Sequence, residues 1–345
     1  MRIDSTTNPD PRSVAQRPIV TIGWMAHWVL RMALIGMLIV YGWTKVFLVQ
    51  MGVADYSSAL VRYGEMSPMG LLWRFMEYSE PVQIAAGAAE VLACLLLVWR
   101  RTAWLGALLG AADMAVVFAL NLFFDVPVKQ LALALFVGFL LLLIPDVPRL
   151  VRIVAGRAAP AAPLPRAIPW PRIHRVTRIL GPVLGLALVL GSGAAIYQSL
   201  GIPAREPTPV SGVYRVTQDA RPPARQLAVD PRWSQVAFGS LAREQGSPMS
   251  VRTADGGLRY GWYRLTPSAP DGSRGTIEAD LGPRMGGPAN PGTSGTQVQL
   301  TYERGADGTL RLSGAGEQLV LSPDAEARFL FDRGYSWEPR QPVNR

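Results

Sequence analysis

Cysteine, histidine and lysine are nearly absent from this 345-residue chain. One cysteine, Cys94, excludes a disulfide framework, a CxxC redox pair and a cysteine-based zinc or iron–sulfur site within the chain. The two histidines argue equally against a metal centre built from several histidines. Charged residues make up only 17% of the chain and apolar residues 49%, with a mean hydropathy of +0.19. That balance excludes a disordered chain and disfavours a fully soluble protein.

Apolar residues are concentrated in the first 200 residues, in five runs long enough to cross a bilayer of about 30 Å. The sequence predicts a polar tail over 1–26 and a four-helix bundle over 27–148. A linker rich in proline and arginine follows at 149–178, and a fifth membrane helix at 179–200 is expected to act as a tether. The five predicted spans are 27–49, 81–99, 102–124, 128–144 and 179–200.

Arginine clusters on one side of the predicted spans. Arg100 and Arg101 lie between the second and third spans, and seven arginines follow the fourth span against one acid, Asp146. The positive-inside rule assigns such segments to the cytoplasm. We therefore expect a multi-pass membrane protein with a cytoplasmic N-terminus and an extracytoplasmic C-terminal domain. The net charge of +9 is then largely a topology signal, and no nucleic-acid partner is expected.

Residues 205–345 contain short runs in which apolar and polar residues alternate between turn signals. In TQVQLTY, Val298, Leu300 and Tyr302 share one face, which is typical of a half-buried strand. The segments ADGG, GADG and GAG supply the positive φ that hairpin turns require. About eight such runs predict a small antiparallel barrel or sandwich, whose aromatic residues either fill the core or line a ligand cavity. The runs are 212–217, 233–239, 249–253, 258–265, 275–280, 296–303, 309–313 and 317–322.

Three ionisable side chains inside the predicted spans are candidates for a buried site: Lys45, Glu90 and Asp113, with Asn121 as a polar neighbour. Arg31 also falls within the first span, but one turn from its cytoplasmic end, where its side chain can reach the headgroups. Charges in hydrocarbon are costly, so such groups face a bundle interior, pair with one another or serve a function. Lys45 lies near the outer end of its span, and a helical side chain leans toward the helix N-terminus. Lys45 is therefore expected to reach inward toward Glu90, which lies near the midplane.

Small residues accompany these charges and predict close helix packing around them. Gly42 and Gly87 each precede a charged residue by three positions, and Gly106 and Gly110 share a helical face with Asp113. Two interpretations stay open. One is a structural network that determines helix packing, and the other is a polar site for a quinone, a lipid headgroup or a proton.

The segments YGWTK and GAAEVLACLLLVWRRTAWLGALLG resemble the DoxX family of four-helix bacterial membrane proteins. Gly42 with Lys45, and Gly87 with Glu90, match the Gly-x-x-Lys of that family's first helix and the glutamate of its second. The ending FLFDRGYSWEPRQPVNR resembles that of DoxX-like proteins with an added extracytoplasmic domain. The resemblance implies the bacterial cytoplasmic membrane and a role in redox processes: thiosulfate oxidation coupled to quinone in one branch, and a scaffold for detoxifying enzymes in another.

The expected architecture is a membrane all-α four-helix DoxX-like bundle plus a fifth transmembrane helix, followed by a small all-β antiparallel barrel or sandwich. We expect an accessory or scaffold protein with an intramembrane polar site for quinone or lipid and a protein partner on the extracytoplasmic side. The alternative is a membrane subunit of a quinone-linked oxidoreductase of sulfur compounds, and a third candidate is a small-ligand transporter. Quinone is the one cofactor considered, no metal is expected, and no catalytic residue is assigned.

Overall fold

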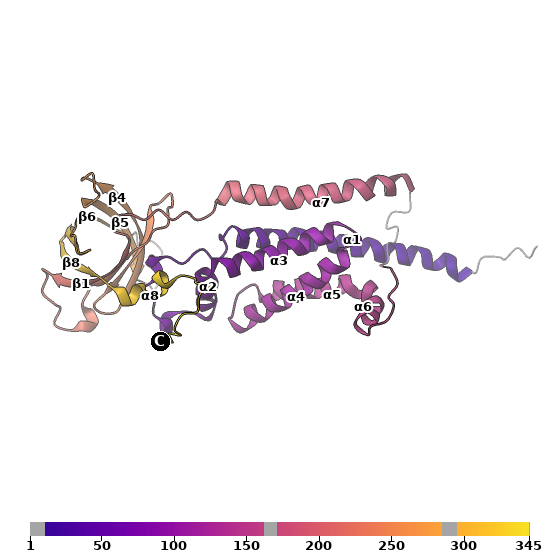
Figure 1. The fold of residues 1–345 in the computed structure, drawn as a ribbon, viewed down its shortest axis with the longest axis horizontal. Helices are drawn as coiled ribbons and strands as arrows, with labels where there is room; N and C mark the ends of the chain where they lie inside the picture. Colours follow the sequence, from indigo (N-terminus) through magenta and orange to yellow (C-terminus); the bar gives the residue numbers. More distant parts are fainter. Residues whose placement is uncertain (1–10, 162–170, 285–294, 345) are drawn as a thin grey trace, which may run out of the picture. The chain divides into compact units, whose positions relative to one another are not determined.

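The computed structural model describes residues 11–161, 171–284 and 295–344, which belong to two compact units (Figure 1). The first unit takes in the chain up to Gly52 and Ser67–Ile202, and it is helical. The second unit takes in Val53–Met66 and Pro203–Arg345, and it contains every strand of the described chain. Residues 53–66, which the sequence pattern leaves within the bundle, therefore fold with the β-domain.

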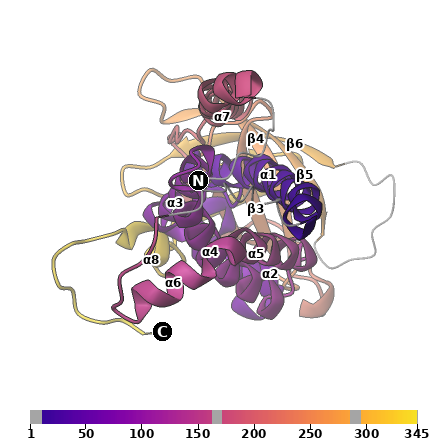
Figure 2. The ribbon, with the colours of Figure 1, turned by 90° about the vertical axis from the view of Figure 1, so that its right-hand side faces the viewer.

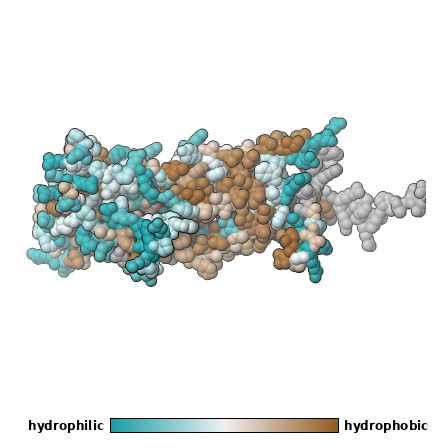
Figure 3. Space-filling view, viewed as in Figure 1, coloured by the Kyte–Doolittle hydropathy of each residue, from teal (hydrophilic) through white to brown (hydrophobic). Residues whose placement is uncertain are grey.

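Five helical segments of the described chain are long and apolar enough to cross a membrane, as the sequence predicts. They are Val20–Val46, Glu80–Val98, Ala103–Phe123, Lys129–Val154 and Arg175–Leu200. The helices of this unit are α1 (Pro11–Val46), α2 (Pro68–Tyr78), α3 (Glu80–Val98), α4 (Ala103–Phe123), α5 (Lys129–Leu143), α6 (Val147–Val154) and α7 (Pro171–Leu200). Apolar side chains gather on the surface of the helices in Figure 3, whereas the strands carry a mostly polar surface.

Two helices begin earlier than the sequence predicts. α1 starts at Pro11 inside the expected polar tail, and α7 starts at Pro171 inside the expected linker. Hydropathy marks only the part of a helix that crosses hydrocarbon, while the backbone hydrogen bonds continue into polar residues. Proline is compatible with the first helical turn, because its missing N–H has no intrahelical partner there.

The bundle core lies between α1, α3, α4 and α5, which gather into one group in Figure 2. Ile35, Leu38, Leu97 and Phe139 are among its fully buried side chains. The fifth helix is more than the expected tether, because α7 packs against both α1 and α3. The indole N–H of Trp43 on α1 donates a 2.9 Å hydrogen bond to a backbone carbonyl of α7, that of Val189.

Eight antiparallel strands form a closed barrel in the second unit, in sequence order, with β8 pairing back to β1. This confirms the predicted β-domain and decides for the barrel over the sandwich. Strands that follow one another in the sequence are antiparallel neighbours, which is an up-and-down order. The strands are β1 (Gly212–Asp219), β2 (Trp233–Phe238), β3 (Ser247–Thr253), β4 (Leu258–Pro267), β5 (Arg274–Arg284), β6 (Thr296–Arg304), β7 (Leu310–Gly314) and β8 (Glu317–Pro323).

The barrel interior is occupied by side chains of its own strands. Alternate residues such as Val236, Phe238, Ile277 and Leu300 point inward and are 0–1% exposed. Among the aromatic residues of this unit, Trp233 and Tyr263 join this core, whereas Trp262 and Trp337 are exposed. Tyr260 packs against a second cluster, which contains Leu60, Val213, Ala237 and Leu258. The buried aromatic residues therefore fill the barrel core.

Candidate functional site

Close packing of α1 against α3 positions the charged residues of the membrane unit. A Cβ on Gly87 would lie 2.7 Å from the Lys45 Cβ and 2.8 Å from the Val46 nitrogen. A Cβ on Gly42 would lie 3.2 Å from both the Glu90 Cβ and the Gly87 carbonyl oxygen. Because any side chain at these two positions would push the helices apart, glycine allows the stem of Lys45 to lie directly on α3.

Lys45 and Glu90 form an ion pair inside this contact. Lys45 Nζ lies 2.5 Å from Glu90 Oε1, and the two residues are only 5% and 1% exposed. The second carboxylate oxygen, Glu90 Oε2, is buried with no hydrogen-bond partner among the described residues. Lys45 therefore reaches inward to Glu90, as its place on α1 predicts. One acceptor oxygen of the Glu90 carboxylate has no donor within the described chain.

A second carboxylate lies within electrostatic range of this pair. Asp113 on α4 is half-buried, and its charge acts on both Lys45 and Glu90. Asp113 Oδ2 is buried without a hydrogen-bond partner in the described chain. Asn121 is also buried, but it lies eight residues further along α4, about 12 Å by helical rise. The structure thus brings Lys45, Glu90 and Asp113 together, and Asn121 lies about two turns of α4 away from Asp113.

The other two glycines bring α4 against its neighbours. A Cβ on Gly106 would lie 2.8 Å from the Ala93 carbonyl oxygen of α3. A Cβ on Gly110 would lie 2.6 Å from Cζ of the Phe139 ring of α5. α4 is therefore held between α3 and α5 at closest approach, which directs the face bearing Asp113 toward the bundle.

The three charges, here called the polar centre, combine two carboxyl groups with one ammonium group. The centre is neutral when one of the two carboxyls carries a proton. It offers two buried acceptor oxygens, Glu90 Oε2 and Asp113 Oδ2. The ammonium group of Lys45 has three N–H donors, of which the hydrogen bond to Glu90 uses one. Chemically, such a centre can hold a proton, accept hydrogen bonds from a ligand and donate one to it.

A different constellation, which the sequence pattern does not indicate, joins residues 53–66 to the barrel. Asp55 is 6% exposed and accepts hydrogen bonds from two directions. Its Oδ1 receives the backbone N–H of Ser240 at 2.7 Å and its hydroxyl at 3.0 Å. Its Oδ2 receives the N–H of Ser57 at 3.1 Å and its hydroxyl at 2.6 Å. One buried carboxylate therefore ties the segment to the residues after β2.

Arg252 of β3 makes the second attachment and is only 2% exposed. Its guanidinium donates to the Leu60 and Gly256 carbonyl oxygens and to both carboxylate oxygens of Glu65, at 2.9 Å and 2.6 Å. The hydrogen bond from Arg252 is the main reason that the pKa of Glu65 is lowered. Arg252 lies at an outward-facing position of β3, where an arginine is ordinarily exposed to solvent. The sequence pattern therefore does not predict its burial.

A third attachment comes from the C-terminal helix α8 (Ala325–Arg333). Tyr56 Oη donates a 2.7 Å hydrogen bond to Asp332, and the Arg328 guanidinium lies 5.2 Å from the centre of the Tyr56 ring. Burial, with the hydrogen bond to Asp332, raises the pKa of Tyr56. Residues 53–66 are thus held by β2, β3 and α8, and we call this set of contacts the segment clamp.

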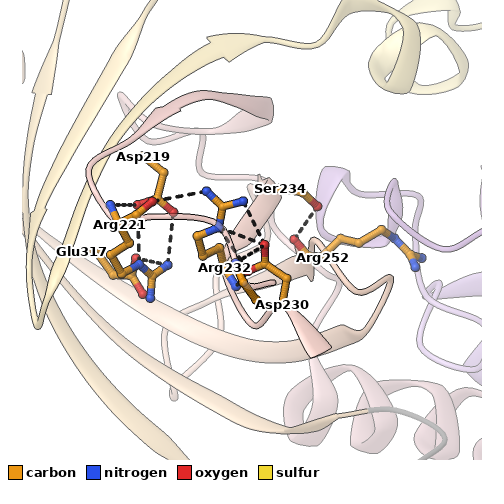
Figure 4. A network of polar contacts seen from close by, with 8 residues as sticks. Asp219, Arg221, Asp230, Arg232, Ser234, Arg252 and Glu317 are labelled. Carbon is orange, nitrogen blue, oxygen red and sulfur yellow. Dashed lines mark hydrogen bonds and ion pairs between the residues drawn. The ribbon is translucent and has the colours of Figure 1, made fainter. Parts of the chain in front are cut away.

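A further group of charges links the ends of β1, β2 and β8 (Figure 4). Arg221 pairs with Glu317 at 2.6 Å and with Asp219 at 3.3 Å, and Arg232 pairs with Asp230 at 2.8 Å. Hydrogen bonds from Arg232 lower the pKa of Asp230 to about 2. Each acid is paired with an arginine, Arg221 serving two of them, and the described residues contain no cluster of metal-ligating side chains. These charges therefore stabilise the barrel end.

The comparisons with known proteins assign no activity. No family model and no solved structure matches the chain. The chain is similar to the uncharacterised protein YwoB of Bacillus subtilis (strain 168), with 34% identity over 105 residues. That match covers 30% of this chain and 66% of YwoB, just under two thirds of that protein's length.

Proposed function

We propose that the protein is an accessory membrane protein whose polar centre binds the polar head of a quinone or quinol. The observation that carries the proposal is the pair of buried, unpartnered oxygens of Glu90 and Asp113. A buried acceptor without a donor costs about 1–3 kcal/mol, so a ligand that donates hydrogen bonds is favoured there. A quinol supplies two hydroxyl donors, and a quinone carbonyl accepts a hydrogen bond from the ammonium of Lys45.

The depth of the site favours a quinone over a lipid headgroup. Asp113 lies ten residues from either end of α4, or about 15 Å along the helix axis. That distance is about half the hydrocarbon thickness of a bilayer, so the site lies near its midplane. A phospholipid headgroup stays at the interface with water, whereas a quinone head on its isoprenoid tail enters the hydrocarbon. The resemblance to the DoxX family, which we propose on the same residues, supports this assignment.

The proposed role is accessory because the chain lacks an evident electron relay of its own. Its single cysteine, Cys94, is buried against the Ile35 carbonyl and has no second thiol in the sequence. Electrons would therefore pass to the quinone from a partner protein. Because the barrel interior is filled, the barrel offers a partner its surface, on the side of the membrane opposite the arginine-rich segments.

Quinone content tests the proposal directly. The purified full-length protein is extracted with organic solvent, and bound quinone is measured per mole of protein. We expect near-stoichiometric quinone in the wild type and a strong loss in Asp113→Asn, which removes a charge without breaking the Lys45–Glu90 pair. Asp125→Asn is the matched control, because that carboxylate forms an exposed pair with Lys129. An empty wild type, or full occupancy in Asp113→Asn, would refute the proposal.

Glu90→Gln separates the ligand site from a purely structural pair. It removes the carboxylate that pairs directly with the buried Lys45. Breaking a buried pair costs about 3–5 kcal/mol, and the nearby carboxylate of Asp113 offsets part of that loss. The double variant Lys45→Met/Glu90→Leu removes both charges and is expected to recover most of the thermal stability lost by Glu90→Gln. We expect that double variant to be stable and free of quinone. A stable double variant that still binds quinone would show that the polar centre is not the binding site.

A further inference from the structure

A second group of buried polar atoms lies at the opposite end of the bundle from Lys45. Arg31 of α1 is 8% exposed, and its Nε has no hydrogen-bond partner among the described residues. Asp146 and Arg149, after the end of α5, approach only to 3.6 Å, and neither Asp146 Oδ1 nor Arg149 Nη1 has a hydrogen-bond partner. Three of the unpartnered buried atoms of the described chain therefore gather at this end.

Positive charge exceeds negative charge here. Among the described residues at this end, Arg31, Arg149 and Arg100, which lies two residues after α3, are accompanied by one carboxylate, that of Asp146. The charge of Arg100 acts on Arg31, and like charges repel. His27, one turn before Arg31, lies within electrostatic range of both Arg31 and Asp146, and its Nε2 is 3.1 Å from a backbone carbonyl of α5. A buried guanidinium in such surroundings lacks the counter-charge that it needs.

The surrounding residues mark this end as a membrane interface. Trp28 and Trp99 are 52% and 42% exposed, and the Arg149 guanidinium stacks on the ring of Trp104 at 4.5 Å. Tryptophan is enriched where hydrocarbon meets lipid headgroups. Arg31 lies one turn before Ile35, whose carbonyl contacts Cys94 one turn before the end of α3. Arg31 is therefore level with the helix ends and within reach of headgroups.

We infer that Arg31, Arg100 and Arg149 bind the phosphate of an anionic phospholipid. Guanidinium groups recognise phosphate oxygens through paired N–H donors, and basic pockets between membrane helices bind lipid headgroups in this way. A phosphate supplies the acceptor that Arg31 Nε lacks and offsets the excess positive charge. The exposed apolar residues Met37 and Val40, which lie further along α1 toward the middle of the membrane, offer a surface for the acyl chains. This site is separate from the polar centre and does not rest on quinone binding.

Thermal unfolding of the delipidated full-length protein in detergent tests the inference. Phosphatidylglycerol, phosphatidylcholine and inorganic phosphate are added in turn, and binding of each lipid is measured by native mass spectrometry. We expect phosphatidylglycerol to raise the melting temperature more than phosphatidylcholine does. Inorganic phosphate should not reproduce that rise. If it does, the site binds a free anion and the lipid assignment is overturned.

Arg31→Met distinguishes a lipid site from a structural arginine. Replacing an unpaired buried charge by an apolar side chain of similar length is neutral or stabilising. We therefore expect Arg31→Met to keep or raise the melting temperature without lipid, and to weaken phosphatidylglycerol binding by about tenfold or more. A lower melting temperature without lipid, or an unchanged response to phosphatidylglycerol, would contradict the inference.

Two further variants complete the test. The Arg100 side chain is half-exposed, so Arg100→Gln is expected to remain folded and to lose part of the phosphatidylglycerol response. Arg157→Gln is the matched control, because that arginine is exposed after α6. Its lipid response should equal that of the wild type. An equal loss of response in Arg100→Gln and Arg157→Gln would reveal general surface attraction to anionic lipid and overturn the specific site.

Discussion

The segment clamp offers the sharpest test of the energetics, through Arg252→Ala. Removing the guanidinium leaves the carbonyl oxygens of Leu60 and Gly256 without their donor, at about 1–3 kcal/mol each. Glu65 adds less, because its side chain is 38% exposed and an exposed ion pair contributes about 0–1 kcal/mol. The expected loss is therefore about 3–5 kcal/mol, and most of it comes from the two carbonyls.

Hydrogen exchange of the full-length protein in detergent is the appropriate assay, because it reports local opening of residues 53–66. Each 1.4 kcal/mol is a factor of ten, so a loss of about 3 kcal/mol speeds exchange there by about a hundredfold. Glu65→Gln, which keeps Arg252 on both carbonyls, is expected to speed exchange by about tenfold or less. Arg311→Ala is the control, since Arg311 is exposed on β7.

The stability of the segment clamp depends on pH, and the pKa of Glu65 determines the sign of that dependence. The folded-state pKa of Glu65 lies below its ordinary value because of Arg252. Its contribution to stability is therefore complete above the ordinary glutamate pKa of 4.5 and is lost as the pH falls through the folded-state value. Arg252→Ala should remove this part of the acid sensitivity. The reasoning fails if exchange in residues 53–66 is unchanged by Arg252→Ala, or if Glu65→Gln is the more damaging variant.

Two more predictions concern packing and acid stability. Gly110→Ala should lower the free energy of unfolding by about 1–3 kcal/mol, because the new methyl overlaps the Phe139 ring; Gly36→Ala, where a Cβ meets nothing within 4 Å, should be close to neutral in the same thermal unfolding assay. Wild-type stability should fall between pH 3.8 and about pH 2 as Asp230 is protonated and its bonds to Arg232 weaken, and Asp230→Asn should flatten that part of the pH profile.

Much of the membrane site follows from the sequence because hydrocarbon tolerates few polar groups. Two acids and one lysine inside apolar spans must face one another or a ligand, so the pairing of Lys45 with Glu90 was predictable from reach and depth. The glycines beside them indicated close helix contact for the same reason. For Asn121, helical periodicity indicates a face of α4 but not its distance from the charges, and it lies eight residues from Asp113 along that helix.

The segment clamp could not be predicted from the sequence. Asp55 and Glu65 look like ordinary loop acids, and Arg252 looks like a solvent-facing residue of a half-buried strand. Their partners lie more than 180 residues away along the chain, as in the hydrogen bonds from Arg252 to Glu65 and from Ser240 to Asp55. A pattern read over a short window contains no trace of such contacts.

The sequence by itself determined the five membrane helices and the eight strands, because hydropathy over about 20 residues and two-residue alternation are local properties of the chain. Only the tertiary structure decided that β8 closes onto β1, that α7 packs on the bundle and that residues 53–66 belong to the barrel. Those outcomes depend on contacts between backbone and side-chain groups that are distant in sequence. Burial selects among such contacts only when the helices and strands pack together.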